Sequence, residues 1–267
     1  MSSAELLPAY FGSSDKPLFG CYSEPRRSRR RTTAVVISQP MGHEYINSHR
    51  ALRQLAIRLS NIGFPVFRFD YSGCGDSSGE GIACRISHWM DDLSEAISEV
   101  QRRSGVASVT LIGLRFGATL SLMASAQRVD VANLVLWDPV ISGKDYLRGL
   151  FSLNKELLRF RPKPGASKTE WPKDVIGFPL THDLYDDIDR IDLRRLRNRT
   201  TANMLFLETE TNPAHECLKD ILESSGATVA FQHMDAPQIW IPTVDGGLQV
   251  PTSVLQFVSS WADRTCS

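Results

Sequence analysis

The residues best placed for chemistry lie in a glycine–arginine–glycine pattern, Gly113-x-Arg115-x-Gly117. The apolar run 108–113 predicts a buried strand, and the small residues of 116–127 predict a helix packed close behind it. A sharp turn between them presents its central side chain at the carboxyl end of a sheet, where open α/β sheets bind ligands. That side chain belongs to Arg115, which stays protonated near neutral pH and therefore cannot attack a carbonyl carbon.

Two further polar motifs follow apolar runs in the same half of the chain. SQPMGHEY (38–45) comes after the β-branched run 33–38, and FDYSGCGDSSGE (69–80) begins at the end of the run 65–70. Because the carboxyl ends of parallel strands meet at one edge of a sheet, we expect both motifs to lie near Arg115.

These motifs offer acid–base and charge-pairing groups. His43 and Glu44 are candidates for a general acid or base, although a histidine in this turn is equally compatible with a hydrogen bond to the backbone. Asp70, Glu44, or Asp138 at a later strand end could each pair with Arg115. Such an ion-pair network would give the arginine a purely structural role.

Other residues of the motifs have simpler interpretations. Asp76 in GCGDS is typical of a turn. Cys74 and Cys84 could supply a thiol nucleophile, but nothing next to either residue indicates a lowered pKa. The five cysteines show no CxxC spacing, so we expect no disulfide framework, no metal site and no cofactor.

Strand and helix patterns alternate from residue 33 onward, which indicates right-handed βαβ units and a mostly parallel, doubly wound sheet with helices on both faces. Two alternating segments, 9–12 and 17–22, predict an N-terminal hairpin. The rhythm breaks across 141–200, where a Pro/Gly/Lys-rich loop precedes a charged amphipathic helix at 183–199. An insertion at this place is predicted to be a helical lid over the strand ends; a surface excursion without a role is the alternative.

Composition limits the class of protein. With 267 residues the chain fits one domain, 1–267, and 30 basic against 30 acidic residues indicate no bias toward nucleic acid. The basic run PRRSRRR (25–31) is interpreted as a solvated loop. No apolar stretch is long enough for a membrane span, and no signal-peptide pattern opens the sequence, so a cytoplasmic location is expected.

Taken together, the three motifs resemble the α/β-hydrolase superfamily, in particular its S33-like branch, over the chain from about residue 33 to its end. Within that branch the sequence resembles hydrolase-like proteins found beside exosortase systems, which also carry arginine at this turn. The resemblance implies an α/β-hydrolase fold. It also identifies Gly113-x-Arg115-x-Gly117 as the nucleophile elbow, with Arg115 in the nucleophile's position.

The family's two other triad positions differ as well. In the superfamily the acid follows the next-to-last strand, where this sequence has Asn212, with Glu208 and Glu210 upstream as substitutes. The histidine lies in the loop after the last strand, where Gln238 stands here. His233 is nearby and is interpreted as a residue of the strand itself. The resemblance thus implies that the Ser–His–Asp machinery is absent.

The family's oxyanion hole would survive the loss of the serine side chain, because backbone amides form it. These amides would belong to Phe116 and to the turn Met41–Gly42–His43. With the positive end of the helix dipole and the charge of Arg115, such a site favours a carboxylate, a phosphate or a thioester oxygen. The expected ligand-binding residues are Gly42, His43, Asp70, Arg115, Phe116 and Asp138.

Three functional hypotheses follow. The first is a homologue without hydrolytic chemistry that binds an acyl-type or anionic small molecule, anchored by Arg115. The second is an enzyme with a relocated nucleophile or base, acting for example on an acyl thioester. The third is a structural or regulatory protein with an inactive pocket. A homodimer or a pathway partner protein is left open.

Overall fold

The computed structural model describes residues 6–26, 31–160, 174–196, 203–242 and 247–266. In this part of the chain an eight-stranded sheet has the order β1-β2-β4-β3-β5-β6-β9-β10. Its strands are β1 (Leu6–Phe11), β2 (Leu18–Ser23), β3 (Thr33–Ser38), β4 (Val66–Phe69), β5 (Ser108–Leu114), β6 (Val131–Trp137), β9 (Asn203–Glu208) and β10 (Thr228–His233).

The sheet is parallel except at one edge. The strands from β4 to β10 pair in parallel, whereas β1 and β2 pair antiparallel with one another, and β2 pairs antiparallel with β4. The predicted N-terminal hairpin is therefore confirmed. All six residues of β3 are buried, which explains why its four central residues, 34–37, are all apolar instead of alternating with polar ones.

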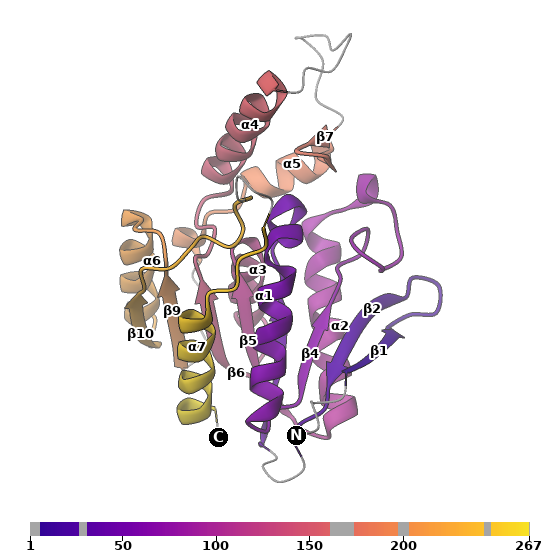
Figure 1. The fold of residues 1–267 in the computed structure, drawn as a ribbon, viewed down its shortest axis with the longest axis vertical. Helices are drawn as coiled ribbons and strands as arrows, with labels where there is room; N and C mark the ends of the chain where they lie inside the picture. The colour runs from indigo at the N-terminus through magenta and orange to yellow at the C-terminus, as the bar shows by residue number, and fades with distance from the viewer. Residues whose placement is uncertain (1–5, 27–30, 161–173, 197–202, 243–246, 267) are drawn as a thin grey trace.

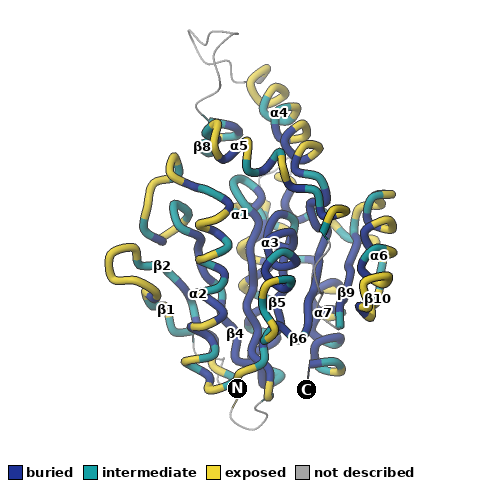
Figure 2. The backbone as a smooth tube through the Cα atoms, turned by 180° about the vertical axis from the view of Figure 1, so that it is seen from behind, coloured by how far each residue is buried: buried dark blue, intermediate teal, exposed yellow. Residues whose placement is uncertain are grey.

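Helices cover both faces of the sheet (Figure 1), as the alternating pattern predicts. One apolar cluster lies between the sheet and α1 and α7, and a second lies on the opposite face against α2, α3 and α6. Figure 2 shows the central strands buried and the outer surfaces of the helices exposed. The helices are α1 (Gly42–Asn61), α2 (Ile86–Ser104), α3 (Phe116–Ser125), α6 (Pro213–Ser224) and α7 (Thr252–Thr265), with a short 3-10 helix η1 (Gly81–Ala83).

A separate segment stands above the carboxyl ends of the parallel strands (Figure 1). Arg85, directly before α2, ties this segment down through ion pairs of 2.7 Å to Asp187 and 2.9 Å to Asp183. We call it the covering segment; its described elements are α4 (Gly143–Phe160), β7 (Asp174–Val175), β8 (Phe178–Pro179), α5 (His182–Asp189) and η2 (Leu193–Arg195).

One predicted helix differs in extent. The charged helix expected over 183–199 is broken: α5 ends at Asp189 and the 3-10 helix η2 follows, because the side chain of Asp192 accepts a hydrogen bond from the amide of Arg194 and starts a new turn. Residues 197–199, the loop 161–173 and most of the basic run lie outside the described residues.

The first helix after β3 begins at Gly42, inside the polar motif 38–45. Gly42 has φ +61°, a conformation that L side chains rarely adopt, and this lets the chain turn directly from β3 into α1. His43 and Glu44 are therefore helical, and Glu44 lies in the first turn, where the helix dipole favours a carboxylate.

Candidate functional site

Arg115 occupies a strained turn between β5 and α3. Its backbone has φ 53° and ψ −121°, outside the regions that a bulky residue normally adopts. The two flanking glycines make the turn possible by removing side chains. A Cβ at Gly113 would lie 2.3 Å from Ala118 Cα, and a Cβ at Gly117 would lie 2.3 Å from the carbonyl oxygen of Ser38. The structure thus has the sharp strand-to-helix turn predicted from this motif.

The arginine side chain is paired on one side and open on the other. Its Nε donates to Glu44 Oε1 at 3.2 Å, and its Nη1 donates to the carbonyl oxygen of Asp138 at 3.4 Å. The guanidinium carbon lies 4.8 Å from the centre of the Trp240 ring, which is a cation–π distance. Among the described residues Nη2 has no acceptor, and the side chain is 18% exposed.

Glu44 is the counter-ion of Arg115 and is itself buried, with a side chain 4% exposed. The hydroxyl of Tyr146, on α4, donates to its other oxygen at 3.3 Å. Burial raises the pKa of Glu44, and the charge and hydrogen bond of Arg115 oppose that rise without cancelling it. The two hydrogen bonds to the Glu44 carboxylate are long, and they do not fully offset the cost of burying its charge.

A cavity of about 360 Å³ lies between the elbow and α4. We call it the outer cavity. Arg115, Asn212 and Gln238, which the family resemblance predicts to occupy the triad positions, all border it, although they are far apart in sequence. His43 and Glu44 border the same cavity, so the structure brings together residues that sequence analysis singled out on four separate segments.

Asn212 and Gln238 make local contacts. Asn212 caps α6, because its side-chain oxygen accepts from the amide of Ala214 at 3.0 Å. The backbone carbonyl of Gln238 accepts from the amide of Ile241, which closes the turn that carries Trp240. Among the described residues neither side chain forms a hydrogen bond with Arg115, so the three residues share a cavity without forming a connected relay.

His43 presents a neutral ring to the outer cavity. Burial, together with the charge of Arg115, lowers the pKa of His43 to about 4, so the ring is uncharged at pH 7. Among the described residues the imidazole has no hydrogen-bond partner. The backbone hydrogen bond considered as an alternative is thus absent from the described contacts.

Glu208 and His233, considered as substitutes for triad members, belong to a separate cluster. Glu208 Oε1 accepts from His233 at 3.0 Å, and Oε2 accepts from His215 on α6 at 2.8 Å and from the amide of Asn212 at 3.2 Å. Burial raises the pKa of Glu208, but the hydrogen bonds from the two histidines outweigh it and the net shift is downward. None of these three side chains lines the outer cavity.

The prediction that Asp70 pairs with Arg115 is wrong. Asp70 follows β4, which β3 separates from β5 in the sheet, and its carboxylate accepts from Gln39 Nε2 and Tyr45 OH, each at 3.0 Å, and from the amide of Asp76. Neutral donors satisfy this carboxylate, so it has no need of the arginine. Asp76 is an exposed turn residue, as predicted.

The prediction that the Asp138 carboxylate faces the cleft is also wrong. Asp138 is fully buried with φ 42°, and its carboxylate accepts from the amide and hydroxyl of Thr209 and from the amide of Glu210. These bonds tie the end of β6 to the turn after β9. Only the backbone carbonyl of Asp138 reaches Arg115.

Cys74, which sequence analysis considered as a nucleophile, is a poor one. The hydrogen bond that its thiol donates to Cys84 and its burial both raise the pKa of Cys74 far above its ordinary value, so this thiol stays protonated. The same hydrogen bond lowers the pKa of Cys84. Among the described residues no group of three or more His, Cys, Asp or Glu side chains is arranged to hold a metal ion. In the same residues no helix combines the length and apolarity that crossing a bilayer requires.

Sequence analysis missed two aromatic residues of the site. Trp240 was a detectable candidate, since it follows Gln238 by two residues in the loop where the family's histidine is expected. Tyr146 carries no local signal, because it lies in the insertion and reaches Glu44 only through the placement of α4 over the strand ends.

The parallel sheet, the strained elbow and the helices on both faces define an α/β-hydrolase fold. A family model described as serine aminopeptidase, S33, matches residues 33–214. Since this match covers more than half of the chain, the protein belongs to that family.

Solved structures share the fold at low identity. An esterase of Pyrococcus furiosus, Pf2001, is 14% identical with a TM-score of 0.68, over 99% of this chain and 92% of that one. Est1E of Butyrivibrio proteoclasticus with bound ferulic acid is 14% identical with a TM-score of 0.66, over 96% of each chain. DcsB in complex with its substrate analogue is 15% identical with a TM-score of 0.67, over 98% and 99%.

One curated relative has local sequence similarity. The mitochondrial palmitoyl-protein thioesterase ABHD10 of Mus musculus is 26% identical over 88 residues. That segment is 32% of this chain and 28% of the relative, so the match spans less than a third of the thioesterase.

Proposed function

We propose that this protein binds an acyl-type or anionic small molecule in the outer cavity, anchored by Arg115, and that it lacks serine-hydrolase chemistry. The observation that carries the proposal is the arginine itself: a cationic side chain stands in the strained elbow position, lines a cavity of about 360 Å³ and keeps Nη2 without an acceptor among the described residues.

The surroundings of Arg115 support an anion more than a cation or a neutral polar group. The first amides of α3 have no partner within their helix, and the positive end of its dipole lies beside the guanidinium. The Trp240 ring shields one face of the guanidinium from water, which strengthens charge-assisted hydrogen bonds made at its edge. Glu44 offsets the charge, but its contact with Nε leaves the opposite edge open.

The loss of hydrolytic chemistry rests on the three triad positions together. Arginine has no nucleophilic lone pair at neutral pH, Asn212 is engaged as a helix cap, and Gln238 cannot act as a base. The acyl character of the ligand is supported by relatives that are named as esterases and a thioesterase, and by the ferulic acid in Est1E. The cytoplasmic location and any protein partner stay predictions.

One observation favours a second candidate, an atypical acyl hydrolase or acyltransferase. His43 is neutral at pH 7, has no hydrogen-bond partner among the described residues and lines the same cavity, so its ring can accept a proton from a water molecule or an alcohol. Turnover of an acyl thioester that disappears in His43→Ala but survives in Arg115→Gln would favour this candidate over simple binding.

A thermal-shift screen of free carboxylates, phosphates and acyl-coenzyme A esters, ferulate included, tests the proposal. We expect at least one anionic compound to raise the Tm of the wild type, with a smaller effect at high salt. In Arg115→Gln the affinity should fall about 10- to 100-fold, the loss expected for a charge-assisted hydrogen bond of about 1.5–3 kcal/mol.

Arg194→Gln is the matched control, because Arg194 borders the same cavity but is paired with Asp192 and more exposed, at 42%. Its response to ligand should equal that of the wild type. If both variants lose the same affinity for the anion, the effect comes from the overall charge of the cavity and not from Arg115. If Arg115→Gln loses no affinity, the proposal is contradicted.

A further inference from the structure

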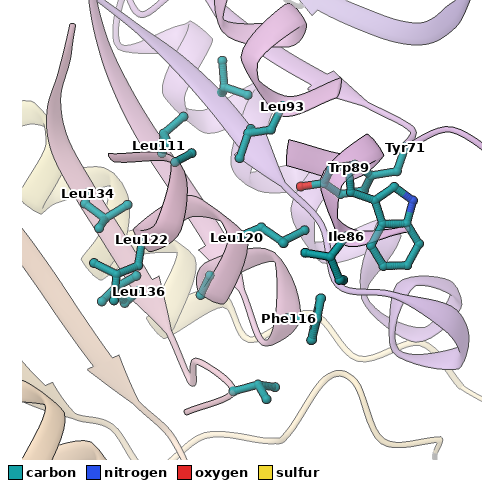
Figure 3. Close-up of a cluster of buried hydrophobic side chains, with 14 of the residues drawn as sticks. Tyr71, Ile86, Trp89, Leu93, Leu111, Phe116, Leu120, Leu122, Leu134 and Leu136 are labelled. Atoms are coloured by element: carbon teal, nitrogen blue, oxygen red, sulfur yellow. The ribbon is translucent and has the colours of Figure 1, made fainter. Parts of the chain in front are cut away.

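A second hollow lies beyond the elbow, on the side of α2 and α3. It has a volume of about 130 Å³ and does not include Arg115. We call it the inner cavity. Its walls include Tyr71, Trp89, Phe116 and Leu120, which Figure 3 shows within one buried cluster. Phe116 and Leu120 are 1% exposed, so these walls belong to the core of the protein.

The aromatic side chains of the inner cavity offer a ligand mainly apolar surface, because their polar atoms already have partners. Tyr71 OH is hydrogen-bonded to Ser38 Oγ at 2.7 Å, and Trp89 Nε1 donates to the carbonyl of Ser72 at 3.2 Å. On the opposite wall, Tyr45 donates its hydroxyl to Asp70. The ring faces remain, and these favour an aliphatic chain or an aromatic ring over a polar group.

The two cavities are neighbours in a row beneath the covering segment. A third hollow, of about 20 Å³, adjoins both of them. It shares His43 and Tyr146 with the outer cavity, and it shares Met41 and Phe178 with the inner one. A ligand whose head contacts Arg115 therefore has an apolar continuation past the start of α1.

From this arrangement we propose that the inner cavity holds the apolar tail of the ligand, so that the ligand class is a medium-chain or aryl-terminated carboxylate. The inference rests on the proposed function for the head group and adds the identity of the tail. The volume of about 130 Å³ is close to that of an apolar cavity of about 150 Å³ that binds benzene, so it suits one ring or about six carbons.

Calorimetric titration with a series of straight-chain carboxylates from butanoate to dodecanoate tests the inference. Once the chain reaches the inner cavity, each added methylene should raise the affinity about fourfold, and the gain should stop when the cavity is full. Cys74→Leu adds volume to the cavity wall. It should remove the gain for the longer acids and leave butanoate unchanged.

Two controls keep the result interpretable. Cys217→Leu makes the same substitution at an exposed cysteine on α6, outside all three hollows, and should behave like the wild type. If Cys74→Leu does not fold, Leu120→Phe fills the same cavity from α3. A chain-length profile that neither filling variant alters would overturn the inference.

Straight-chain alcohols separate this inference from the proposed function. If acids bind, lose affinity in Arg115→Gln and show no dependence on chain length, the tail site fails and the anion site stands. If alcohols and acids bind equally, with affinity lost in Cys74→Leu and unchanged in Arg115→Gln, the inner cavity is real but the bipartite ligand is contradicted, and the proposed function fails with it.

Discussion

Glu44 and Glu208 are both buried carboxylates near the carboxyl edge of the sheet, with side chains 4% and 6% exposed, yet their pKa values shift in opposite directions. Burial alone would raise both. For Glu44, one arginine contact at 3.2 Å and one tyrosine contact at 3.3 Å leave the pKa raised. For Glu208, two histidines and an amide at 2.8 to 3.2 Å bring the pKa below its ordinary value.

The opposite pKa shifts distinguish the Glu208 cluster, whose hydrogen bonds are fully supplied by the protein, from the Arg115–Glu44 pair, whose hydrogen bonds a ligand can replace. Glu208 has three donors and does not line the outer cavity, so its cluster holds β9, β10 and α6 together. The Arg115–Glu44 pair borders the cavity and is held by long contacts, so a ligand anion can compete for the arginine. The predictions below test this contrast.

The largest expected effect is the missing reactivity of the elbow. Wild type should show no turnover of p-nitrophenyl butyrate and no labelling by a fluorophosphonate probe. Arg115→Ser alone should stay inactive, because Gln238 supplies no base and His233 is held by Glu208 outside the cavity. In a triad enzyme the loss of nucleophile or base costs ~10⁶-fold in turnover.

Adding Gln238→His to Arg115→Ser tests whether the missing base accounts for this inactivity. Any gain should appear only in the double variant. Turnover by the single variant would mean that His43 already acts as the base, and stoichiometric labelling of a wild-type serine would contradict the account of the elbow.

Arg115→Gln should lower the free energy of unfolding by about 2–4 kcal/mol at pH 8, because the buried carboxylate of Glu44 loses its counter-ion. Without the arginine, the raised pKa of Glu44 rises further. The penalty should therefore be small below the ordinary pKa of glutamate and should grow as pH rises through the folded-state pKa.

Denaturant titrations of both proteins between pH 4.5 and pH 8 measure this dependence. The double variant Arg115→Gln, Glu44→Gln is the control, since its neutral pair should remove the pH-dependent part. A penalty of equal size at every pH would show that Glu44 does not carry the uncompensated charge.

Glu208→Gln should cost about 1.5–3 kcal/mol at pH 7 through its hydrogen bonds to His215 and His233. The lowered pKa of Glu208 means that the wild type holds this stability above the ordinary pKa of glutamate and loses it as pH falls through the folded-state pKa. The difference between the two proteins should thus shrink in acid. Anion binding, measured by thermal shift at pH 7, should not change in Glu208→Gln. A loss of binding would show that the Glu208 cluster and the Arg115–Glu44 pair are coupled.

Tyr146→Phe should have the smallest effect, about 0.5–1.5 kcal/mol of stability, because it removes one long hydrogen bond to Glu44. Tyr45→Phe is its matched control: it removes a donor to the buried carboxylate of Asp70, which does not contact Arg115. Only Tyr146→Phe should alter the dependence of anion affinity on pH, followed by calorimetry at pH 6 and pH 8. The same change in both variants would contradict a specific link between α4 and the elbow.

The fold and the elbow were accessible from sequence because local signals specify them. Short β-branched runs such as 33–38 mark buried parallel strands, and Gly113 and Gly117 mark a close approach of backbones that only glycine permits. The family resemblance singled out Arg115, Asn212 and Gln238 as the triad-equivalent positions, and these three residues border one cavity; their equivalence to the triad stays a prediction.

Which carboxylate pairs with Arg115 could not be predicted from the sequence. Glu44, Asp70 and Asp138 all follow strands at the same edge, and sequence spacing does not say which carboxylate already has neutral donors. Asp70 and Asp138 are satisfied by side chains and amides from other segments, which leaves Glu44. Tyr146 was hidden for the same reason, since its contact depends on how the covering segment packs.

A crystal structure of the protein with bound octanoate tests the central claim most directly. The account predicts a carboxylate oxygen within about 2.7–3.2 Å of Arg115 Nη2, with Glu44 still at Nε. Octanoate bound away from Arg115, or a guanidinium turned so that Glu44 takes both of its outer nitrogens, would contradict the claim that the elbow arginine is an anion anchor.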